Sequence, residues 1–526
     1  MLLVCAINLL TVVRAARILG IVALPSYSHQ VVFQPLWREL SIRGHQVTTL
    51  TTDPINDPKL TNLTEIDLHF AYETWNKDIM VTALKFQGNS IGLINNLMKQ
   101  AFDVIDEELR HPKVQALIHG DDEFDLVIIE VIALPFLPFA AKFKCPVINI
   151  ISLDMSSRLH QLMGNPTHPI LYPDVYYPYD EHLTFRQRLT SVIITCLMNV
   201  NGIHAYLAAN SMAQKYFGPN YPSLVDIIYN VSMIFVNTDP ILHRVRPFVP
   251  TVVQIGGGSH LKPARLLPTD LQELLDNAES GFIYFSLGSN VKSKDIPIDL
   301  RETILETFAE LPYMVLWKFE AENLPNRPKN VFISKWLPQQ DVLRKKLDDD
   351  RISAFFVAGH RNIKLFVTQG GLQSMEEAVY SGVPMVVMPF FADQGYNAKA
   401  IVYKGMGLSV DYANLKKEEF RDKVLEVIRE PRYRNRVKEL ARLALDQPMT
   451  GMERAVWWTE YVIRHKGAEH LNSPIKDFPW YKYLLLDVLV VLVASLMVVV
   501  GGVYCALRTV WIYFRRNRKD KEKKTK

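Results

Sequence analysis

The chain has 526 residues, of which 48% are hydrophobic and 22% charged, and its formal net charge at pH 7 is +4. This length exceeds what one hydrophobic core usually organises, so we expect two domains plus accessory segments, and the apolar content excludes a disordered protein. The basic charge gathers in the tail from Arg515 to Lys526 rather than on a domain face, which argues against a nucleic-acid partner.

The first segment, residues 1–16, contains a short apolar run and ends in small residues. This pattern is typical of a cleaved secretory signal, although a basic start is missing. It predicts that most of the chain lies in the lumen of a secretory compartment. Two acceptor motifs for N-glycosylation begin at Asn62 and Asn230. Cys145 and Cys196 allow at most one disulfide outside the apolar segments.

Residues 17–246 alternate strand-like and helical segments. Apolar runs that predict strands lie at Arg17–Pro25, His45–Thr51, Phe124–Val131 and Cys145–Ile151. Strands that alternate with helices predict βαβ units and a parallel sheet, so we expect a first α/β domain over this range. Its apolar stretch from Leu189 to Val200 is too short to span a bilayer. We expect this stretch to pack into the core, with contact to a membrane surface as the alternative.

Residues 247–268 are rich in Pro and Gly and predict a linker. Beyond it, residues 269–445 repeat the rhythm of short apolar strands and predict a second α/β domain. The clearest of these strands lie at Gly281–Ser289, Leu365–Thr368 and Pro384–Met388. We assign residues 446–483 to a returning helix and a membrane-proximal segment.

An apolar segment, residues 484–507, is long enough to cross a bilayer core and has aromatic residues at both flanks. We interpret it as a single transmembrane helix, with a buried core helix as the alternative. The basic tail, residues 508–526, then lies in the cytosol, which gives a type I topology with both α/β domains in the lumen. Lys523 and Lys524 resemble a dilysine signal for return to the endoplasmic reticulum; a solvated basic tail is the alternative.

The stretch from Phe366 to Asn397 places polar groups between two strand ends. Gly370 and Gly371 follow one strand and precede a helix, so this turn can bring backbone N–H groups close to a phosphate. The spacing matches neither a dinucleotide fingerprint nor a P-loop. Glu377, further along the helix, is placed to accept hydrogen bonds from ribose hydroxyls.

Other residues of this half complete a candidate nucleotide-sugar site. Asp393 and Gln394, beyond the next strand, offer a carboxylate and an amide of the kind that hold sugar hydroxyls. Upstream, Trp336 offers an indole on which a base can stack, and Gln339 offers an amide to read its edge. A core position for Trp336 and a solvated helix face for Glu377 are the alternatives.

The segments FSLGS (residues 285–289), KWLPQQDVL (residues 335–343) and the stretch at 366–397 carry a specific resemblance. In order and spacing they resemble the donor-binding signature of the membrane-bound UDP-glycosyltransferases, the family that includes the UDP-glucuronosyltransferases. The resemblance extends over nearly the whole chain. It implies the GT-B architecture: two Rossmann-like domains that face a cleft, with UDP-sugar on the C-terminal domain and acceptor on the N-terminal one, plus the C-terminal transmembrane helix.

The resemblance also assigns roles to individual residues. Trp336 and Gln339 would contact uracil, Glu377 the ribose, and Asp393 and Gln394 the sugar. The residues assigned to the diphosphate region are Ser289, Gln369, Gly371 and Ser374. Many relatives have His at the position of Gln369, so a neutral amide replaces a cationic contact here. Similar QGG turns in insect and baculovirus members favour an active enzyme of invertebrate type.

His29 follows the first strand, where the family keeps the base that takes the acceptor proton in an inverting transfer. An imidazole with an ordinary pKa near about 6.5 suits this task at neutral pH. Glu130 follows the strand at Phe124–Ile129, where relatives commonly have Asp. It would orient His29 and stabilise the imidazolium, as the acid of a catalytic triad does. A surface turn is the alternative for His29.

The sequence therefore predicts an enzyme of the endoplasmic reticulum membrane. It would transfer glucose or glucuronic acid, with inversion, from a UDP-sugar to a hydroxyl of a small lipophilic acceptor, and the invertebrate resemblance favours UDP-glucose. No cluster of His and Cys has metal-ligand spacing, so we expect neither a metal nor a cofactor beyond the UDP-sugar. Homo-oligomerisation is left open. The alternative function is an impaired, glycosyltransferase-like binding or accessory protein.

Residues 344–358 (RKKLDDDRISAFFVA) interrupt a segment that in relatives would run almost directly from Leu343 to Gly359. We interpret the abrupt junctions as an alternative or mispredicted exon boundary. A tolerated surface loop is the alternative, because the entropic cost of loop closure grows slowly with loop length. Full-length transcripts decide between them, since the exon interpretation is wrong if every transcript encodes these residues.

Overall fold

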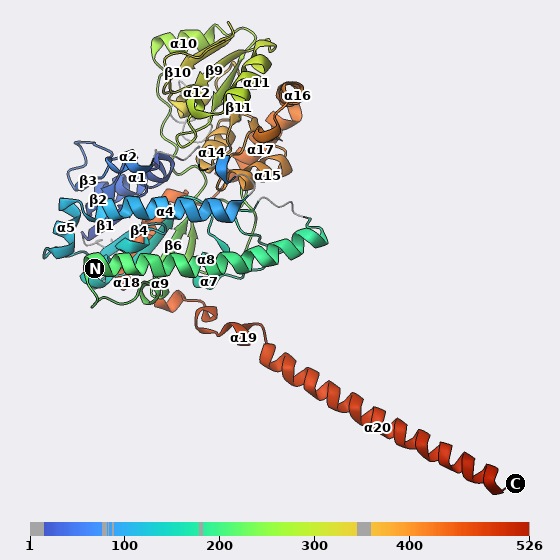
Figure 1. The fold of residues 1–526 in the computed structure, drawn as a ribbon. Helices are drawn as coiled ribbons and strands as arrows, with labels where there is room; N and C mark the ends of the chain where they lie inside the picture. The colour runs from blue at the N-terminus through green and yellow to red at the C-terminus, as the bar shows by residue number, and fades with distance from the viewer. Residues whose placement is uncertain are drawn as a thin grey trace, which may run out of the picture. The chain divides into compact units, whose positions relative to one another are not determined.

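The computed structural model describes residues 15–75, 82, 84–86, 89–177, 182–344 and 359–524 (Figure 1). The described residues up to Asn472 form one compact unit, and those from Ser473 onward form a second. The predicted signal at residues 1–16 lies almost wholly outside the described residues. Of the segment 344–358, only Arg344 is described.

The first sheet is parallel throughout, with strand order β3-β2-β1-β4-β5-β6-β7. Its strands are β1 (Arg17–Val22), β2 (Gln46–Thr51), β3 (Leu63–Asp67), β4 (Leu126–Glu130), β5 (Val147–Ile151), β6 (Met233–Val236) and β7 (Val252–Gln254). β1 pairs with β4, and Ile21 lies opposite Ile129. Because the winding reverses at this pair, the crevice at its carboxyl ends is the place where such sheets bind ligands.

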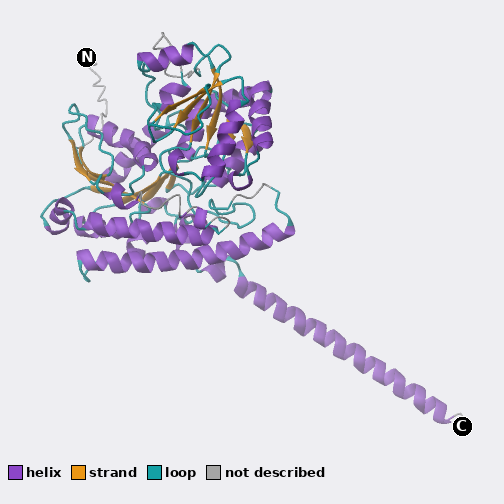
Figure 2. Ribbon diagram, turned by 45° about the horizontal axis from the view of Figure 1, so that its top comes forward, coloured by secondary structure: helices purple, strands orange, loops and turns teal. Residues whose placement is uncertain are grey.

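Helices cover both faces of this sheet (Figure 2). They are α1 (Tyr27–Ile42), α2 (Ala71–Trp75), α4 (Ser90–Leu109), α5 (Pro112–His119), α6 (Pro138–Phe143), α7 (Ser157–Leu162), α8 (Phe185–Phe217) and α9 (Leu224–Tyr229). The side chains of β1 alternate between two apolar clusters: Leu19 and Ile21 belong to one, and Ile18 and Val22 to the other. Such continuous apolar runs are typical of parallel strands that are buried on both faces.

The second sheet is also parallel, with strand order β10-β9-β8-β11-β12-β13. Its strands are β8 (Phe282–Ser286), β9 (Met314–Lys318), β10 (Val331–Ser334), β11 (Ile363–Thr368), β12 (Met385–Val387) and β13 (Gly407–Ser409). The helices around it are α10 (Thr269–Asp276), α11 (Ile298–Ala309), α12 (Gln339–Leu343), α14 (Leu372–Tyr380), α15 (Gln394–Tyr403), α16 (Lys417–Arg429) and α17 (Pro431–Leu445). The winding reverses between β8 and β11. Two Rossmann-like domains are thus present, which confirms the predicted fold class.

After the second sheet the chain returns to the first one through α18 (Gly451–His465). Ala455 and Val456 join the apolar cluster that also contains Phe33 and Trp37 of α1. Arg454 Nη1 donates a hydrogen bond to the carbonyl oxygen of Gln254, at 2.7 Å. The first sheet is therefore covered in part by residues from the far end of the chain.

The long helix α8 presents much of its apolar surface to solvent. Leu189 is 53% exposed and Ile193 is 51% exposed, so the expectation that the stretch from Leu189 to Val200 packs into the core is wrong. By length and composition α8 is apolar enough to cross a membrane. Only a narrow side of the helix is buried, and that side is formed by Ser191, Ile194, Ala209, Ala213 and Phe217. Cys145 and Cys196 are free thiols, so the disulfide that the sequence left open is not formed.

The second unit contains α19 (Trp480–Tyr483) and α20 (Leu486–Lys524). The part of α20 from Leu486 to Arg518 is also long enough, and apolar enough in composition, to cross a membrane. All but the first two residues of the predicted transmembrane segment, 484–507, lie within it.

The described residues on either side of positions 345–358 lie side by side. Arg344 forms an antiparallel bridge with Gly359, and the backbone N–H of His360 donates to the carbonyl oxygen of Leu343, at 3.1 Å. In the sequence, residues 345–358 are therefore inserted between two residues, Arg344 and Gly359, that pair with each other. The exon interpretation stays a prediction.

Candidate active site

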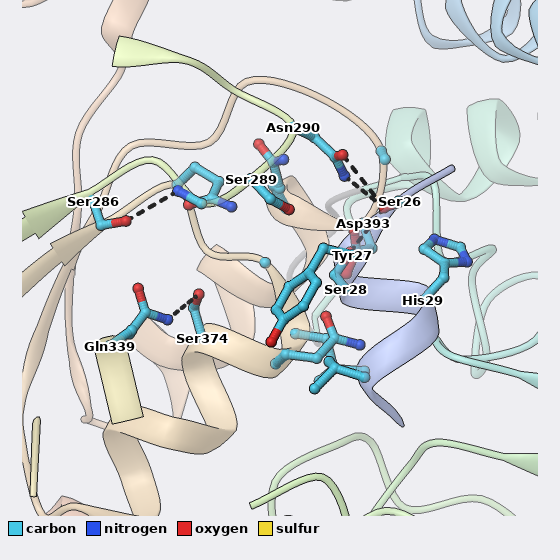
Figure 3. A pocket seen from close by; sticks show the side chains of 18 of the residues that line it. Ser26, Tyr27, Ser28, His29, Ser286, Ser289, Asn290, Gln339, Ser374 and Asp393 are labelled. Carbon is cyan, nitrogen blue, oxygen red and sulfur yellow. Dashed lines mark hydrogen bonds between the residues drawn. The ribbon is translucent and has the colours of Figure 1, made fainter. Parts of the chain in front are cut away.

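A cavity of about 410 Å³ is lined by residues that follow strands of both sheets (Figure 3). Every residue predicted for the site lines this cavity except Glu130, which lies behind His29. The wall from the first domain is mostly apolar, whereas the wall from the second domain carries most of the polar groups. Within the described ranges, no cluster of His, Cys, Asp and Glu side chains is arranged to hold a metal ion.

His29 lies in the first turn of α1, directly after β1. Its Nδ1 is 2.5 Å from Oε1 of Glu130, the last residue of β4. Ser152, which follows β5, has its Oγ 3.0 Å from the same Nδ1 and 3.4 Å from Glu130 Oε1. Because β1, β4 and β5 are neighbours in the sheet, their carboxyl ends bring these three side chains together. Sequence analysis missed Ser152, although its place at a strand end could have indicated it.

The contacts at Nδ1 favour one tautomer of the neutral His29 ring, and the surrounding charges raise its pKa. Both side chains of the His29–Glu130 pair are buried. Burial alone would lower the pKa of His29, but Glu130, with a smaller contribution from Asp393, outweighs burial and leaves this pKa raised. When Nδ1 carries the proton and donates a hydrogen bond to Glu130, Nε2 is the free acceptor atom of the ring. The surface-turn alternative for His29 is therefore wrong.

In the second domain, the turn after β11 lies at the switch point of the sheet. Gly370 has a φ of +83°, and a Cβ there would lie 2.5 Å from Val387 Cγ1, so this position requires glycine. Gly371 is the N-cap of α14, which leaves the free N–H groups of that helix at the cavity. Gln369 is buried beside Gly288, where a Cβ would lie 2.1 Å from the Gln369 amide nitrogen. Ser289 follows on the loop after β8.

Glu377 of α14 is held by the amides of α12. Gln339 Nε2 donates to Glu377 Oε2 at 2.7 Å and to Ser374 Oγ at 3.0 Å, and Gln340 Nε2 donates to Glu377 Oε1 at 2.9 Å. Glu377 is buried, so the solvated-face alternative is wrong. Both of its carboxylate oxygens are fixed before any ligand arrives.

Trp336 lies on the loop between β10 and α12 and is 59% exposed, so it is not a core residue. Its ring forms a T-shaped contact with the ring of Tyr27 of the first domain, with the ring centroids 5.8 Å apart. Lys318 Nζ lies 5.4 Å from the centre of the same indole. The indole of Trp336 therefore lines the cavity and keeps much of its surface exposed.

Asp393 is the N-cap of α15 and Gln394 is the first residue of this helix, and both line the cavity. Asp393 Oδ2 accepts a hydrogen bond from Asn397 Nδ2 at 2.7 Å, and burial raises the pKa of Asp393. Gln394 Oε1 accepts hydrogen bonds from the backbone N–H groups of Phe390 and Phe391, at 2.8 and 3.1 Å. These contacts fix both side chains at the cavity, and Asp393 is near enough to His29 to raise its pKa.

Direct contacts join the two domains around the cavity. Asn290 Nδ2 donates to Ser26 Oγ at 3.0 Å, just before the turn that carries His29 (Figure 3). Gln373 Nε2 donates to the carbonyl oxygen of Ser152 at 3.1 Å. Sequence analysis missed these partners, since nothing in the local pattern relates positions that lie hundreds of residues apart.

Two doubly wound parallel sheets with a cavity at the carboxyl ends of their strands form the GT-B fold of glycosyltransferases. Solved structures share this fold. The glycotransferase of kitacinnamycin matches with a TM-score of 0.55 and 22% identity, covering 85% of this chain and 99% of that one. The glycosyltransferase VinC, solved in complex with DTDP, matches with a TM-score of 0.54 and 17% identity, covering 86% and 100%.

The family is shown by sequence. The family model described as "UDP-glucoronosyl and UDP-glucosyl transferase" matches residues 18–524, and the chain belongs to this family. The UDP-glycosyltransferase UGT5 of Dactylopius coccus is 33% identical, covering 95% of this chain and 94% of its own. An ecdysteroid UDP-glucosyltransferase of Spodoptera littoralis nuclear polyhedrosis virus is 31% identical, covering 93% and 96%. UDP-glucuronosyltransferase 1A3 of Homo sapiens is 28% identical, covering 90% and 87%.

Proposed function

We propose that this family member transfers glucose or glucuronic acid, with inversion, from a UDP-sugar to a hydroxyl of a small lipophilic acceptor. The observation that carries the proposal is the His29–Glu130 pair, 2.5 Å apart, of which His29 lines the same cavity as the polar groups of the second domain. Residues 17–246 would hold the acceptor and residues 269–445 the donor. The impaired-protein alternative has no support, since the family and the named relatives are transferases.

The acceptor would occupy the apolar wall of the cavity. The side chains that form this wall include Leu24, Trp75, Leu93, Leu97, Met98 and Ile132. An apolar pocket with few polar groups suits a lipophilic molecule whose single hydroxyl points at His29.

The donor would lie along the polar wall. Uracil stacks on Trp336 beside Gln339, and the ribose hydroxyls donate to Glu377. The diphosphate lies against the N-terminus of α14, where the backbone N–H groups and the helix dipole favour an anion. The groups that line this diphosphate position are Ser289, Gln369, Gly371 and Ser374. Asp393 and Gln394 hold the hydroxyls of the sugar.

With the proton on His29 Nδ1, the other ring nitrogen, Nε2, is free to act as the base. Nε2 takes the acceptor proton as the acceptor oxygen attacks the anomeric carbon. The new C–O bond forms as the bond from that carbon to the diphosphate breaks, and attack from the opposite face inverts the anomeric centre. Glu130 stabilises the imidazolium that results, and UDP leaves with its charge held at the N-terminus of α14.

Turnover tests this proposal. Microsomes that carry the protein should release UDP when given UDP-glucose and a panel of phenols and sterols, and competition with UDP-glucuronate should show which donor is used. The viral relative named as an ecdysteroid UDP-glucosyltransferase favours UDP-glucose. Binding of UDP-sugar without acceptor-dependent release, across a broad panel, would overturn the proposal.

The pH profile of transfer should have an acidic limb set by His29. Its imidazole must be neutral to take a proton, so activity falls as the pH drops through the raised pKa of His29. Glu130 opposes the effect of burial and is the main cause of the raised pKa. Glu130→Gln should therefore shift the limb to lower pH. Profiles of kcat/KM between about pH 5 and 9 measure this; an unmoved limb would show that another group sets it.

Trp336→Ala should raise the KM for UDP-sugar about tenfold, because stacking of one base on an aromatic ring contributes about 1–3 kcal/mol. Trp336→Phe, which keeps an aromatic face, should recover most of the loss. Trp457→Ala is the matched control, since Trp457 is also an exposed tryptophan but lies on α18 and does not line the cavity. Equal KM values for all these variants would exclude Trp336 as the base platform.

For location, the proposal is a single-pass type I protein of the endoplasmic reticulum membrane. The apolar part of α20 would form the anchor, with residues 508–526 in the cytosol. In sealed microsomes, protease should remove only the tail, and glycosidase should act on Asn62 or Asn230 only after the membrane is opened. Digestion of the α/β domains in sealed vesicles would show that these domains lie on the cytosolic side, opposite to the proposed orientation.

A further inference from the structure

A histidine of the linker lies fully buried behind the proposed ribose carboxylate. His260 has none of its surface exposed. Its Nε2 is 3.5 Å from Glu377 Oε1, and its Nδ1 is 3.4 Å from Glu376 Oε2. Among the described residues, neither ring nitrogen has a hydrogen-bond partner, and each faces a carboxylate at ion-pair distance. His260 does not line the cavity, so it would act on the donor only through Glu377.

Glycines before His260 allow the linker to approach α14 this closely. The backbone N–H of Gly257 donates to Glu376 Oε1 at 3.3 Å. Gly258 has a φ of +76°, and a Cβ there would lie about 3.0 Å from the ring of Tyr380. A larger residue would push the linker away from the helix and His260 with it.

The linker is also fastened to α12, whose amides hold the other side of Glu377. The backbone N–H of Lys262 donates to Gln340 Oε1 at 2.9 Å, and that of Arg265 donates to Asp341 Oδ1 at 2.8 Å. Gln340 in turn donates to Glu377 at 2.9 Å. Glu377 is thus held between α12 and the linker.

The charges of His260, Glu376 and Glu377 influence the pKa values of one another. Glu376 and Glu377 are adjacent buried carboxylates, and burial raises the pKa of Glu376. Burial alone would lower the pKa of His260, but Glu377 and Glu376 outweigh it and leave this pKa raised, although Arg344 acts against them. Burial alone would raise the pKa of Glu377, but His260 first, and then the amides of α12, leave it lowered. A protonated His260 therefore favours an ionised Glu377, the form that accepts hydrogen bonds from ribose.

We propose that His260 is a positioning residue for donor binding: it holds the Glu377 carboxylate in place from behind, which makes the interdomain linker part of the UDP-sugar site. This inference rests on the proposed role of Glu377 at the ribose. It predicts an effect on the affinity for UDP and UDP-sugar rather than on the rate of transfer from bound substrates.

His260→Ala should raise the KM for UDP-sugar and the Kd for UDP about tenfold, equivalent to about 1.4 kcal/mol, because it removes the imidazole that faces the buried Glu377 carboxylate. Its kcat should stay within about twofold. His260→Gln keeps a donor of similar size and should show a smaller rise, and it carries the test if the alanine variant does not fold. The control is His45→Gln, because His45 is also fully buried, 3.8 Å from Glu460 Oε1, but lies at the amino end of the first sheet. It should leave the KM unchanged.

A double-variant cycle separates this inference from the proposed function. Glu377→Gln alone should raise the KM for UDP-sugar, and adding His260→Gln should cost little more, because both act on one contact. If Glu377→Gln raises the KM while the His260 variants do not, or if the effects simply add, the inference is overturned and the ribose assignment stands. If Glu377→Gln leaves the KM unchanged, the ribose assignment is wrong, and the inference fails with it.

Discussion

Replacing His29 with Ala should reduce sugar transfer by about a hundred- to ten-thousand-fold, the usual contribution of a general base. The change removes Nε2, the only ring atom left free to take the acceptor proton once Nδ1 donates to Glu130. The groups assigned to the donor belong to the other domain, so the Kd for UDP should stay nearly unchanged. UDP release measures the rate, and titration with UDP measures the affinity.

The control for this variant is His45→Ala, which removes a buried histidine remote from the cavity. It should retain transfer if it folds. Near-normal turnover by His29→Ala in a folded, membrane-inserted protein would contradict the assignment of the base, and with it the mechanism proposed for the N-terminal domain.

Glu130→Gln should reduce transfer about ten- to a hundred-fold, less than the loss of the base itself. The amide can still accept a hydrogen bond from Nδ1, but it carries no charge to stabilise the imidazolium, and each pKa unit lost by His29 corresponds to about tenfold. Ser152 Oγ stays 3.0 Å from Nδ1 and helps to hold the ring. The measurement is kcat at saturating donor, at a pH where the imidazole is neutral in both proteins.

Ser152→Ala is the companion variant, because it removes a neutral partner of the same nitrogen. Its loss should be smaller than that of Glu130→Gln, since no charge is removed. If Glu130→Gln matched the unaltered protein at every pH, the buried carboxylate would have no part in the reaction.

The fold could be predicted from the sequence because its strands are short, apolar and separated by helical patterns. That rhythm predicts two parallel sheets, and a parallel sheet brings residues after neighbouring strands to one edge. His29 after β1 and Glu130 at the end of β4 could therefore be proposed as neighbours. Gln369 and Gly371 after β11 follow the same logic. Their catalytic and binding roles stay predictions until the variants are measured.

The residues that sequence analysis missed are those whose partners lie far away in the chain. Ser26 meets Asn290, Tyr27 meets Trp336, and His260 lies behind Glu377. No local periodicity encodes such pairs, because they depend on how the two domains and the linker pack. The sequence pattern indicates which residues of a strand are buried, but it does not indicate which residues face one another across the cavity.

The helix α8 shows a different limit of pattern analysis. Apolar residues lie on both its buried and its outer side, so periodicity does not indicate which side faces the protein. The side chains of Leu189 and Ile193 were expected in the core because their apolar run is too short to span a bilayer, but they are exposed. Apolar composition alone does not distinguish burial in a protein from exposure to another apolar environment.

Because α18 packs on the first sheet, it determines where this enzyme can be truncated and which segments can be exchanged between relatives. A soluble form that stops at residue 445, where the second α/β domain ends by sequence, would strip Ala455 and Val456 from the apolar face of α1 and leave it open to aggregation. A soluble form should instead end at Asn472, where the first compact unit ends. Chimeras that exchange acceptor specificity between relatives should likewise take α18 together with residues 17–254, because those two stretches of chain form one folded half.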